Sequence, residues 1–141
     1  MFIHKSIKFT TLNNDSYCLD QDLEVCAVHL TSFCDKLCVL AIHRSPLGNF
    51  TTFLSNFDFI LNKFFNLRFN FIIHGDIDIN YLVEGLKKIN LTIIYSSSIV
   101  NFPTRTGPNS FSTIDNVFVD NSYLNKFDVI PLINSLSDHN A

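Results

Sequence analysis

Two carboxylates lie directly after a predicted buried strand, where their side chains could do chemistry. Asp76 and Asp78 follow the apolar run Phe69–Ile73 and Gly75, at the point where the chain must leave the sheet. The crevice at the carboxyl ends of strands is where ligands bind in α/β architectures. Carboxylate oxygens there suit a hard cation such as Mg²⁺. On spacing alone, Gly-Asp-Ile-Asp fits an ordinary solvated turn before a helix at least as well.

A second set of polar residues comes later in the chain. Asp115 lies within Ser-Thr-Ile-Asp-Asn-Val-Phe, and Asp138 and His139 lie within Ser-Asp-His near the end. A histidine with carboxylates from separate segments is what metal-assisted phosphodiester cleavage needs. One carboxylate holds the cation, the histidine transfers a proton, and another carboxylate orients the imidazole. By itself, His139 also fits a solvated residue in a polar tail.

The composition predicts a single globular domain. The chain has 141 residues, of which 47% are hydrophobic, and a formal net charge of −3. This length suits one domain, and the hydrophobic content argues against disorder. Because autonomous nucleic-acid binders are usually basic, the negative charge argues mildly against unaided DNA binding.

The cysteines and the apolar runs indicate the cellular compartment in which the protein is expected. Cys18, Cys26, Cys34 and Cys38 include no Cys-x-x-Cys pair, which argues against a structural zinc site. Cys26 and Cys38 fall within apolar runs and are expected to be core residues. No signal peptide and no run of membrane-spanning length is visible. We therefore expect an intracellular protein with free thiols and no membrane partner.

The clearest predicted elements are three strands and a helix. Apolar residues at helical spacing predict a helix over Phe50–Phe64, capped by Asn49 or Thr51. Strands are predicted at Leu23–Leu30, Leu37–Ile42 and Phe69–His74, adjacent in one sheet with the helix across them, and a sharp turn is predicted at Gly75. Further predictions are a short helix at Tyr81–Lys88, a loop at Asn101–Ser110, and strands within Phe2–Leu12 and at Leu91–Tyr95, Thr113–Val119 and Phe127–Leu132. Hairpin and crossover connections together indicate an α+β or mixed α/β class.

Five stretches in this order resemble the endonuclease/exonuclease/phosphatase superfamily, and most of all the endonuclease domains of non-LTR retrotransposons. They are Leu40–Phe50, with Arg-Ser-Pro, His74–Asp78, with Gly-Asp-Ile-Asp, Asn101–Arg105, Thr113–Phe118 and Leu136–His139. The resemblance covers nearly the whole chain. It implies a pancreatic deoxyribonuclease-like fold, a four-layer sandwich of two β-sheets flanked by helices, and Mg²⁺-dependent hydrolysis of phosphodiesters.

The resemblance also implies a role for each site residue. Asp76 matches the carboxylate that positions or activates the attacking water. Asp115 matches the acid that orients the catalytic histidine, His139. The metal ligands implied are Asp138 and Asp78, and the substrate contacts implied are Asp78, His43, Arg44 and Arg105.

The sequence departs from the family pattern at several places. Asp78 stands where the family has asparagine, and an ionised carboxylate cannot donate to a phosphate oxygen and repels both it and Asp76. His43 stands where the family has tyrosine. The family's glutamate metal ligand and a companion asparagine lie before anything that matches Met1. We therefore expect residues 1–141 to form one domain, a partial sandwich incomplete at the N-terminus and the C-terminus, and to lack activity alone.

Two functions follow from these observations. The first is a fragment of a Mg²⁺-dependent endonuclease that nicks DNA, joined in its parent polyprotein to a reverse transcriptase and having access to the nucleus. The alternative is a catalytically inactive remnant that at most binds another protein.

Overall fold

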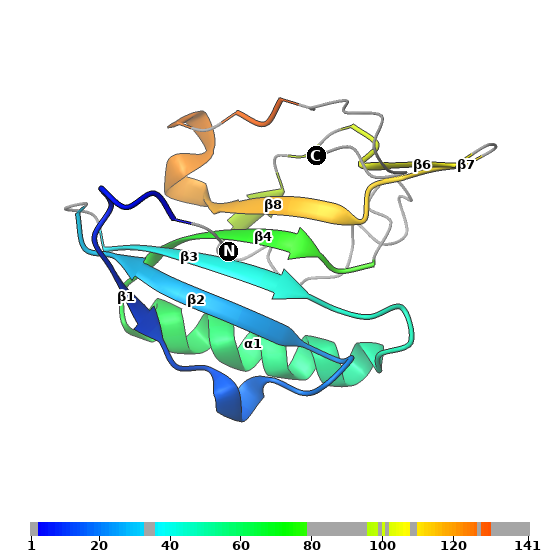
Figure 1. Ribbon diagram of the computed structural model, residues 1–141, viewed down its shortest axis with the longest axis horizontal. Coiled ribbons are helices and arrows are strands. Elements are labelled where there is room, and N and C mark those ends of the chain that lie inside the picture. The colour runs from blue at the N-terminus through cyan, green and yellow to red at the C-terminus, as the bar shows by residue number, and fades with distance from the viewer. Residues whose placement is uncertain are drawn as a thin grey trace.

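The computed structural model describes residues 3–32, 36–78, 96–98, 100, 102–107, 110–126 and 128–130. Its main feature is a six-stranded sheet with a long helix along one face (Figure 1). In spatial order the strands are β1 (Phe9–Leu12), β2 (Glu24–Leu30), β3 (Leu37–His43), β4 (Asn70–Asp76), β8 (Asp115–Asp120) and β5 (Ser96–Ser98). A separate two-stranded sheet pairs β6 (Arg105–Gly107) with β7 (Ser110–Ser112). Two short 3₁₀ helices are η1 (Asp15–Tyr17) and η2 (Asn121–Lys126).

The three predicted strands are adjacent, as the sequence indicated. β2 and β3 form an antiparallel hairpin, and β3 and β4 run parallel because α1 (Phe50–Asn66) crosses between them. β8 then pairs antiparallel with the other edge of β4. The sheet is therefore mixed, which confirms the predicted α+β class.

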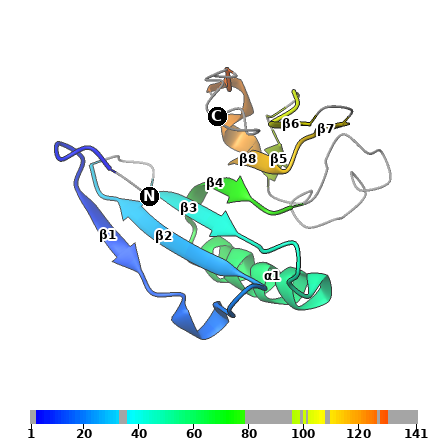
Figure 2. The same cartoon turned by 45° about the vertical axis from the view of Figure 1, so that its right-hand side comes forward.

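The helix α1 buries its phenylalanine stripe against the sheet. It begins after Asn49, whose side chain accepts a hydrogen bond from the backbone N–H of Thr52 at 3.0 Å, so the predicted cap is confirmed. Figure 2 shows the helix lying along one face of the strands. Its buried residues are Phe53, Phe57, Ile60, Leu61 and Phe64, and the strands contribute Leu40, Ile42, Phe71, Ile73 and Phe118 to the same core. In the part of the chain that is described, no helix is long and apolar enough to cross a membrane.

The cysteines divide between the two faces of the sheet. Cys38 is fully buried on the helix side, and burial raises the pKa of its thiol to about 12. Cys26 is exposed, because alternation along β2 directs it to the other face. The prediction that both are core residues is therefore correct for Cys38 and wrong for Cys26.

The predicted turn at Gly75 is wrong: the strand continues through this residue. Gly75 pairs with Ile42 on one side and Asn116 on the other, and the chain turns only after Asp76. Its φ of +153° is rare for other residues, and an added Cβ would overlap the carbonyl oxygen of Ile42. Glycine is required here by a close approach of two strands.

The strands after residue 100 lie at other positions than predicted. The expected loop Asn101–Ser110 contains β6, and the strand expected over Thr113–Val119 begins only at Asp115. Thr113 is withdrawn from the ladder because its Oγ1 donates to the carbonyl oxygen of Phe102 at 2.9 Å.

The remaining element predictions have mixed outcomes. Among the described residues 3–12, only Phe9–Leu12 forms a strand, and residues 128–130 of the strand expected at Phe127–Leu132 are not extended in a sheet. The helix expected at Tyr81–Lys88 and the strand expected at Leu91–Tyr95 lie outside the described residues.

Candidate active site

The sheet register places four ionisable residues in one row. His43 lies opposite Glu24 on one side and Asp76 on the other, and Asp76 in turn lies opposite Asp115. Residues opposite each other share a face of the sheet. Because Ile73 belongs to the core beneath α1, alternation along β4 directs Asp76, three residues later, to the face opposite the helix. The row therefore crosses the open face at one end of four neighbouring strands.

Asp76 and Asp115 form the central pair of this row. Both are partly buried, and side chains at directly opposite positions of an antiparallel pair have Cβ atoms about 4.5–5.5 Å apart. Two carboxylates this close suit Mg²⁺, which is commonly held by one or two carboxylates, waters and substrate phosphate oxygens. No group of three His, Cys, Asp or Glu side chains that could hold a metal ion is found among the residues described. The carboxylates of Asp76 and Asp115 therefore fit Mg²⁺ as two candidate protein ligands.

The Asp76 carboxylate is oriented by the turn that follows it. The backbone N–H of Asp78 donates to Asp76 Oδ1 at 3.1 Å, an Asx turn that Asp and Asn favour. Asp78 has a φ of +48°, a left-handed conformation that Asp and Asn tolerate better than most residues. Between them, the backbone N–H of Ile77 donates to the carbonyl oxygen of Ile114 at 3.2 Å, which ties the turn to the segment before β8.

Arg44, predicted to contact substrate, directs its guanidinium into the protein. Its side chain is 9% exposed. Nη1 donates to the carbonyl oxygen of Ile77 and Nη2 to that of Gly48, each at 3.2 Å. Nη1 also lies 3.9 Å from Asp78 Oδ2. Buried Nε has no hydrogen-bond partner within the described part of the chain.

His43 is exposed at the end of β3 and lies beside a residue that the sequence did not single out. Its Nδ1 is 3.7 Å from Glu24 Oε2, and both side chains are about half exposed. Glu24 opens the strand opposite His43 because the hairpin register pairs them. The signal in the sequence was the hairpin itself, since its loop length fixes which residues face each other.

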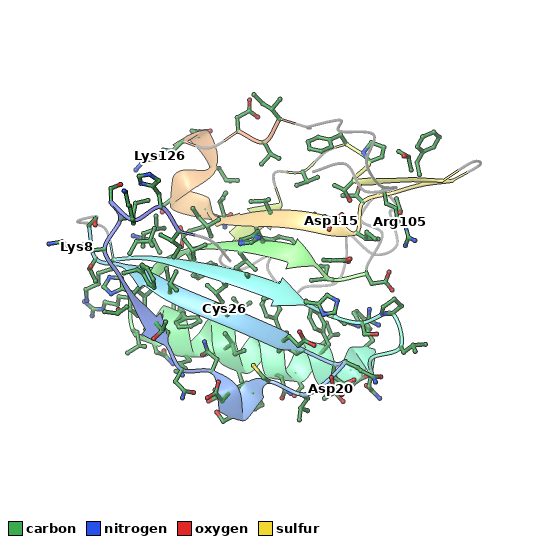
Figure 3. All side chains as sticks on the ribbon, in the orientation of Figure 1. Lys8, Asp20, Cys26, Arg105, Asp115 and Lys126 are labelled. Carbon is green, nitrogen blue, oxygen red and sulfur yellow. The ribbon has the colours of Figure 1, made fainter. Side chains whose placement is uncertain are left out.

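Thr104 is a second residue that sequence reasoning missed. It is 4% exposed, and its Oγ1 accepts hydrogen bonds from the backbone N–H groups of Ile114 and Asp115 at 3.2 and 3.0 Å. Thr104 thereby fixes the start of β8 and the position of Asp115. Arg105 follows directly, opposite Ser112, and Figure 3 shows Arg105 and Asp115 at the same end of the molecule.

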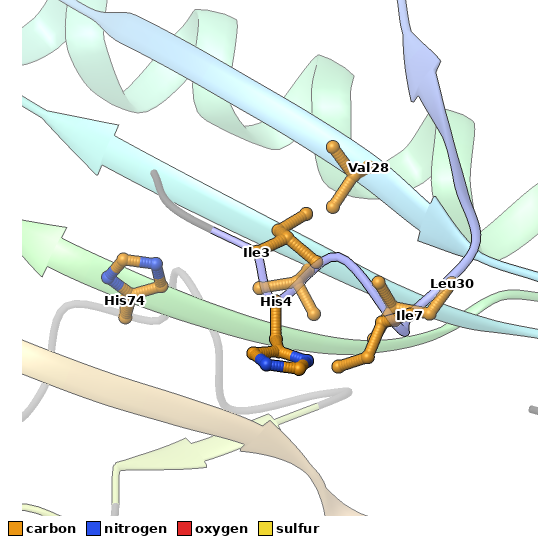
Figure 4. Close-up of a pocket in the computed structure, with 7 residues that line it drawn as sticks. Ile3, His4, Ile7, Val28, Leu30 and His74 are labelled. Atoms are coloured by element: carbon orange, nitrogen blue, oxygen red, sulfur yellow. The ribbon is translucent and has the colours of Figure 1, made fainter. Parts of the chain in front are cut away.

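A pocket of about 250 Å³ lies on the same face as the row (Figure 4). It is lined by Ile3, His4, Ile7, Val28, Leu30, Val39 and His74. Burial lowers the pKa of His74 below its ordinary value of 6.5. His74 is therefore neutral at physiological pH.

Two predicted site residues, Asp138 and His139, lie outside the described residues. The contact between Asp115 and His139 and the role of Asp138 as a metal ligand therefore stay predictions.

Comparison with known proteins identifies the fold. No family model matches the chain, and no curated protein matches it. Among solved structures, an endonuclease/exonuclease/phosphatase family protein from Bacteroides thetaiotaomicron superposes with a TM-score of 0.51 at 16% identity, over 84% of this chain and 52% of that one. A mannosyl-6-phosphatase from the same organism gives a TM-score of 0.52 at 15% identity, over 84% and 54%. The chain spans about half the length of these structures. It therefore has the mixed α+β, pancreatic deoxyribonuclease-like fold that endonuclease/exonuclease/phosphatase proteins share.

Proposed function

We propose that this chain is part of a divalent-metal-dependent phosphodiesterase domain, and that Asp76 and Asp115 are its central carboxylates. The observation that carries the proposal is their register: they lie opposite each other at the open end of β4 and β8, in a fold shared with endonuclease/exonuclease/phosphatase proteins. The carboxyl ends of strands in open sheets are where such sites form.

Asp76 and Asp115 would hold the cation, and Asp138 is the further ligand that the resemblance implies. A bound Mg²⁺ would polarise the phosphodiester and offset its charge. Asp76, oriented by its hydrogen bond from Asp78, can orient a water by accepting its proton in a hydrogen bond. Asp115, fixed by Thr104, can accept a hydrogen bond from an imidazole, the role proposed toward His139.

DNA is the substrate that we propose, with nicking as the reaction. The stretches from Leu40–Phe50 to Leu136–His139 support the closeness to retrotransposon endonucleases, and that closeness implies a reverse transcriptase in the same polyprotein and a nuclear site of action. The phosphatase among the similar structures makes a phosphate monoester the competing substrate class.

A non-catalytic, protein-binding remnant is the second candidate. The row contains three carboxylates, Glu24, Asp76 and Asp115, and the whole chain has a net charge of −3. Such a surface repels a nucleic-acid backbone unless cations cover it. This electrostatic barrier favours a protein over DNA as the partner of an unmetallated domain.

Metal binding tests the proposal directly. Mn²⁺ binding to the folded chain, followed by paramagnetic broadening of NMR signals, should weaken about tenfold or more in Asp76→Asn and in Asp115→Asn, because a carboxylate ligand is lost. Asp58→Asn is the matched control, since Asp58 is exposed on α1. Equal affinity in all variants would overturn the assignment of these carboxylates.

Nicking of supercoiled plasmid with Mg²⁺ or Mn²⁺ then separates the two candidates. Cleavage that falls about 10²-fold or more in Asp76→Asn and disappears in His139→Ala supports the endonuclease. Hydrolysis of p-nitrophenyl phosphate without nicking would support the monoester class. Cation binding with neither activity would support the remnant.

A further inference from the structure

We propose that Arg44 is a positioning residue: it clamps the Asp76–Asp78 turn from inside the fold and takes the Asp78 carboxylate as its counter-ion. The positioning role rests on the function proposed for Asp76, whereas the clamp itself does not. Sequence reasoning had expected Arg44 to contact a nucleic-acid backbone.

Arg44 contacts each residue of the turn in succession. Its backbone N–H donates to the carbonyl oxygen of Asp76 at 3.0 Å. Its Nη1 donates to the carbonyl oxygen of Ile77 at 3.2 Å and lies 3.9 Å from Asp78 Oδ2. One residue directly after β3 therefore contacts all three residues of the turn that carries the candidate metal ligand Asp76.

The same guanidinium joins the turn to the start of α1. Nη2 donates to the carbonyl oxygen of Gly48 at 3.2 Å, and the Arg44 Cζ lies 5.4 Å from the ring centroid of Phe50 and 6.0 Å from that of Phe53. A planar fork with several fixed donors can serve two carbonyls and a carboxylate at once. A lysine carries the charge but lacks this geometry.

Burial explains why the counter-ion matters. The side chain of Arg44 is 9% exposed and that of Asp78 is 28% exposed, and a charge withdrawn from water to this degree is costly unless it is paired. An asparagine at position 78, the residue that the resemblance implies, would leave Arg44 without a carboxylate partner in the turn. The residues at 44 and 78 are therefore coupled, and the charge of Asp78 is directed towards Arg44 instead of towards the substrate.

A double-substitution cycle tests the clamp in the whole chain. Asp78→Asn should lower Tm by about 4 °C and Arg44→Met by roughly 10 °C. The Tm loss of the double variant should be smaller than the sum of the two single losses by at least about 3 °C, because each single variant leaves an unpaired charge and the double variant does not. Asp58→Asn, an exposed carboxylate on α1, should shift Tm by about 1 °C or less.

Mn²⁺ affinity tests the positioning role in variants that stay folded. Arg44→Lys, which keeps the charge, should bind Mn²⁺ about tenfold more weakly than the parent, because a lysine cannot hold the carbonyl oxygen of Ile77 in the turn and that of Gly48 before α1 at the same time. Lys8→Met, which removes an exposed cation at the other end of the molecule (Figure 3), should bind Mn²⁺ as the parent does.

The outcomes separate the clamp from the proposed function. Additive Tm losses in the cycle would overturn the clamp. If Arg44→Met fails to fold, Asp78→Asn becomes the deciding measurement, and an unchanged Tm in that variant would overturn the clamp. Parent-like Mn²⁺ affinity in folded Arg44→Lys would overturn the positioning role alone. A parent that binds no Mn²⁺ would overturn the proposed function and the positioning role together, and the cycle would still decide the clamp.

Discussion

Each residue in the row at the open end of the sheet sets the electrostatic environment of its neighbours. His43 lies between two carboxylates, Glu24 and Asp76, and Asp76 also lies opposite Asp115. A cation held by Asp76 and Asp115 would relieve the repulsion between these carboxylates. The row is therefore better suited to holding positive charge than to meeting a phosphate directly.

His74 should make the chain less stable in acid. Its pKa is lowered by burial below 6.5, so the folded state favours the neutral imidazole. Above pH 6.5 neither state is protonated and the full stability is present. As pH falls from 6.5 towards the folded pKa, the unfolded chain binds the extra proton and stability is lost.

The measurement is Tm at about pH 7.5 and about pH 5 for the parent and for His74→Leu. The parent should lose more stability on acidification than the variant. The neighbours of His74 across the strands, Ala41 and Val117, do not titrate, and His4 lines the same pocket. His4→Gln is therefore the control. Identical acid sensitivity in the parent and His74→Leu would show that His74 is not responsible.

Residue types indicated the chemistry of the site better than they indicated where each side chain points. Asp76 and Asp115, which come from two separate stretches of the sequence, lie opposite each other in the sheet. Arg44 was expected to contact substrate because its actual partners, the carbonyl oxygen of Ile77 after the adjacent strand and that of Gly48 before α1, are backbone atoms that no side-chain pattern reveals. Glu24 was missed because its neighbour is set by hairpin register.

At the scale of the element, α1 was the easiest to predict because its apolar residues repeat at helical spacing over 17 residues. The contribution of its N-cap residue to the free energy of unfolding can be tested by substitution. Asn49→Ala should cost about 1 kcal/mol and lower Tm by roughly 4 °C, because the side chain accepts from the Thr52 N–H.

The matched control for the cap is Asn62→Ala. Asn62 lies in the same helix, and its side chain donates a hydrogen bond to the Asp58 carboxylate one turn earlier. Unlike Asn49, this side chain does not accept from a backbone N–H at the start of the helix. It should change Tm by about 1 °C or less. Equal losses in both variants, measured by far-UV circular dichroism, would mean that Asn49 does not act through its capping bond.

Glycine and proline positions misled the prediction of strand ends. Gly75 looked like a turn, yet the strand needs a glycine there because Ile42 approaches too closely for a side chain. The segment Asn101–Ser110, with its proline and glycine, looked like a loop and contains β6. In both places tertiary contacts between distant segments decide the conformation, and local composition does not record them.

At the scale of the whole molecule, the described residues supply a six-stranded sheet, a two-stranded sheet and one α-helix of the predicted sandwich. The helix side carries the main core, and the other face carries the smaller cluster of Val28, Leu30 and Leu37, with Ile3 and Ile7 packed against it. The fold was predictable from the sequence because motif order and hydrophobic pattern agree. The chain matches about half the length of the similar structures.

Exposed apolar side chains predict that the isolated chain associates with itself. Phe111 is 65% exposed on β7 and Leu47 is 86% exposed in the loop before α1, and β1 is a short strand at the edge of the sheet. Unpaired edges and exposed aromatic surface both favour contacts between chains. Sedimentation velocity over a hundredfold range of concentration, about 1 to about 100 μM, should show a rising mean mass.

Two variants separate surface association from misfolding. Leu47→Ser combined with Phe111→Ser should reduce the association and leave Tm within about 2 °C, because neither side chain belongs to the core. Phe57→Ala, which empties a core position that is 2% exposed, should cost about 3–5 kcal/mol and increase association through the unfolded state. A parent chain that sediments as one monomeric species with a cooperative thermal transition would contradict the prediction. It would mean that the smaller apolar cluster and its cover, Ile3 and Ile7, are enough to keep the open face of the sheet out of contact with other chains.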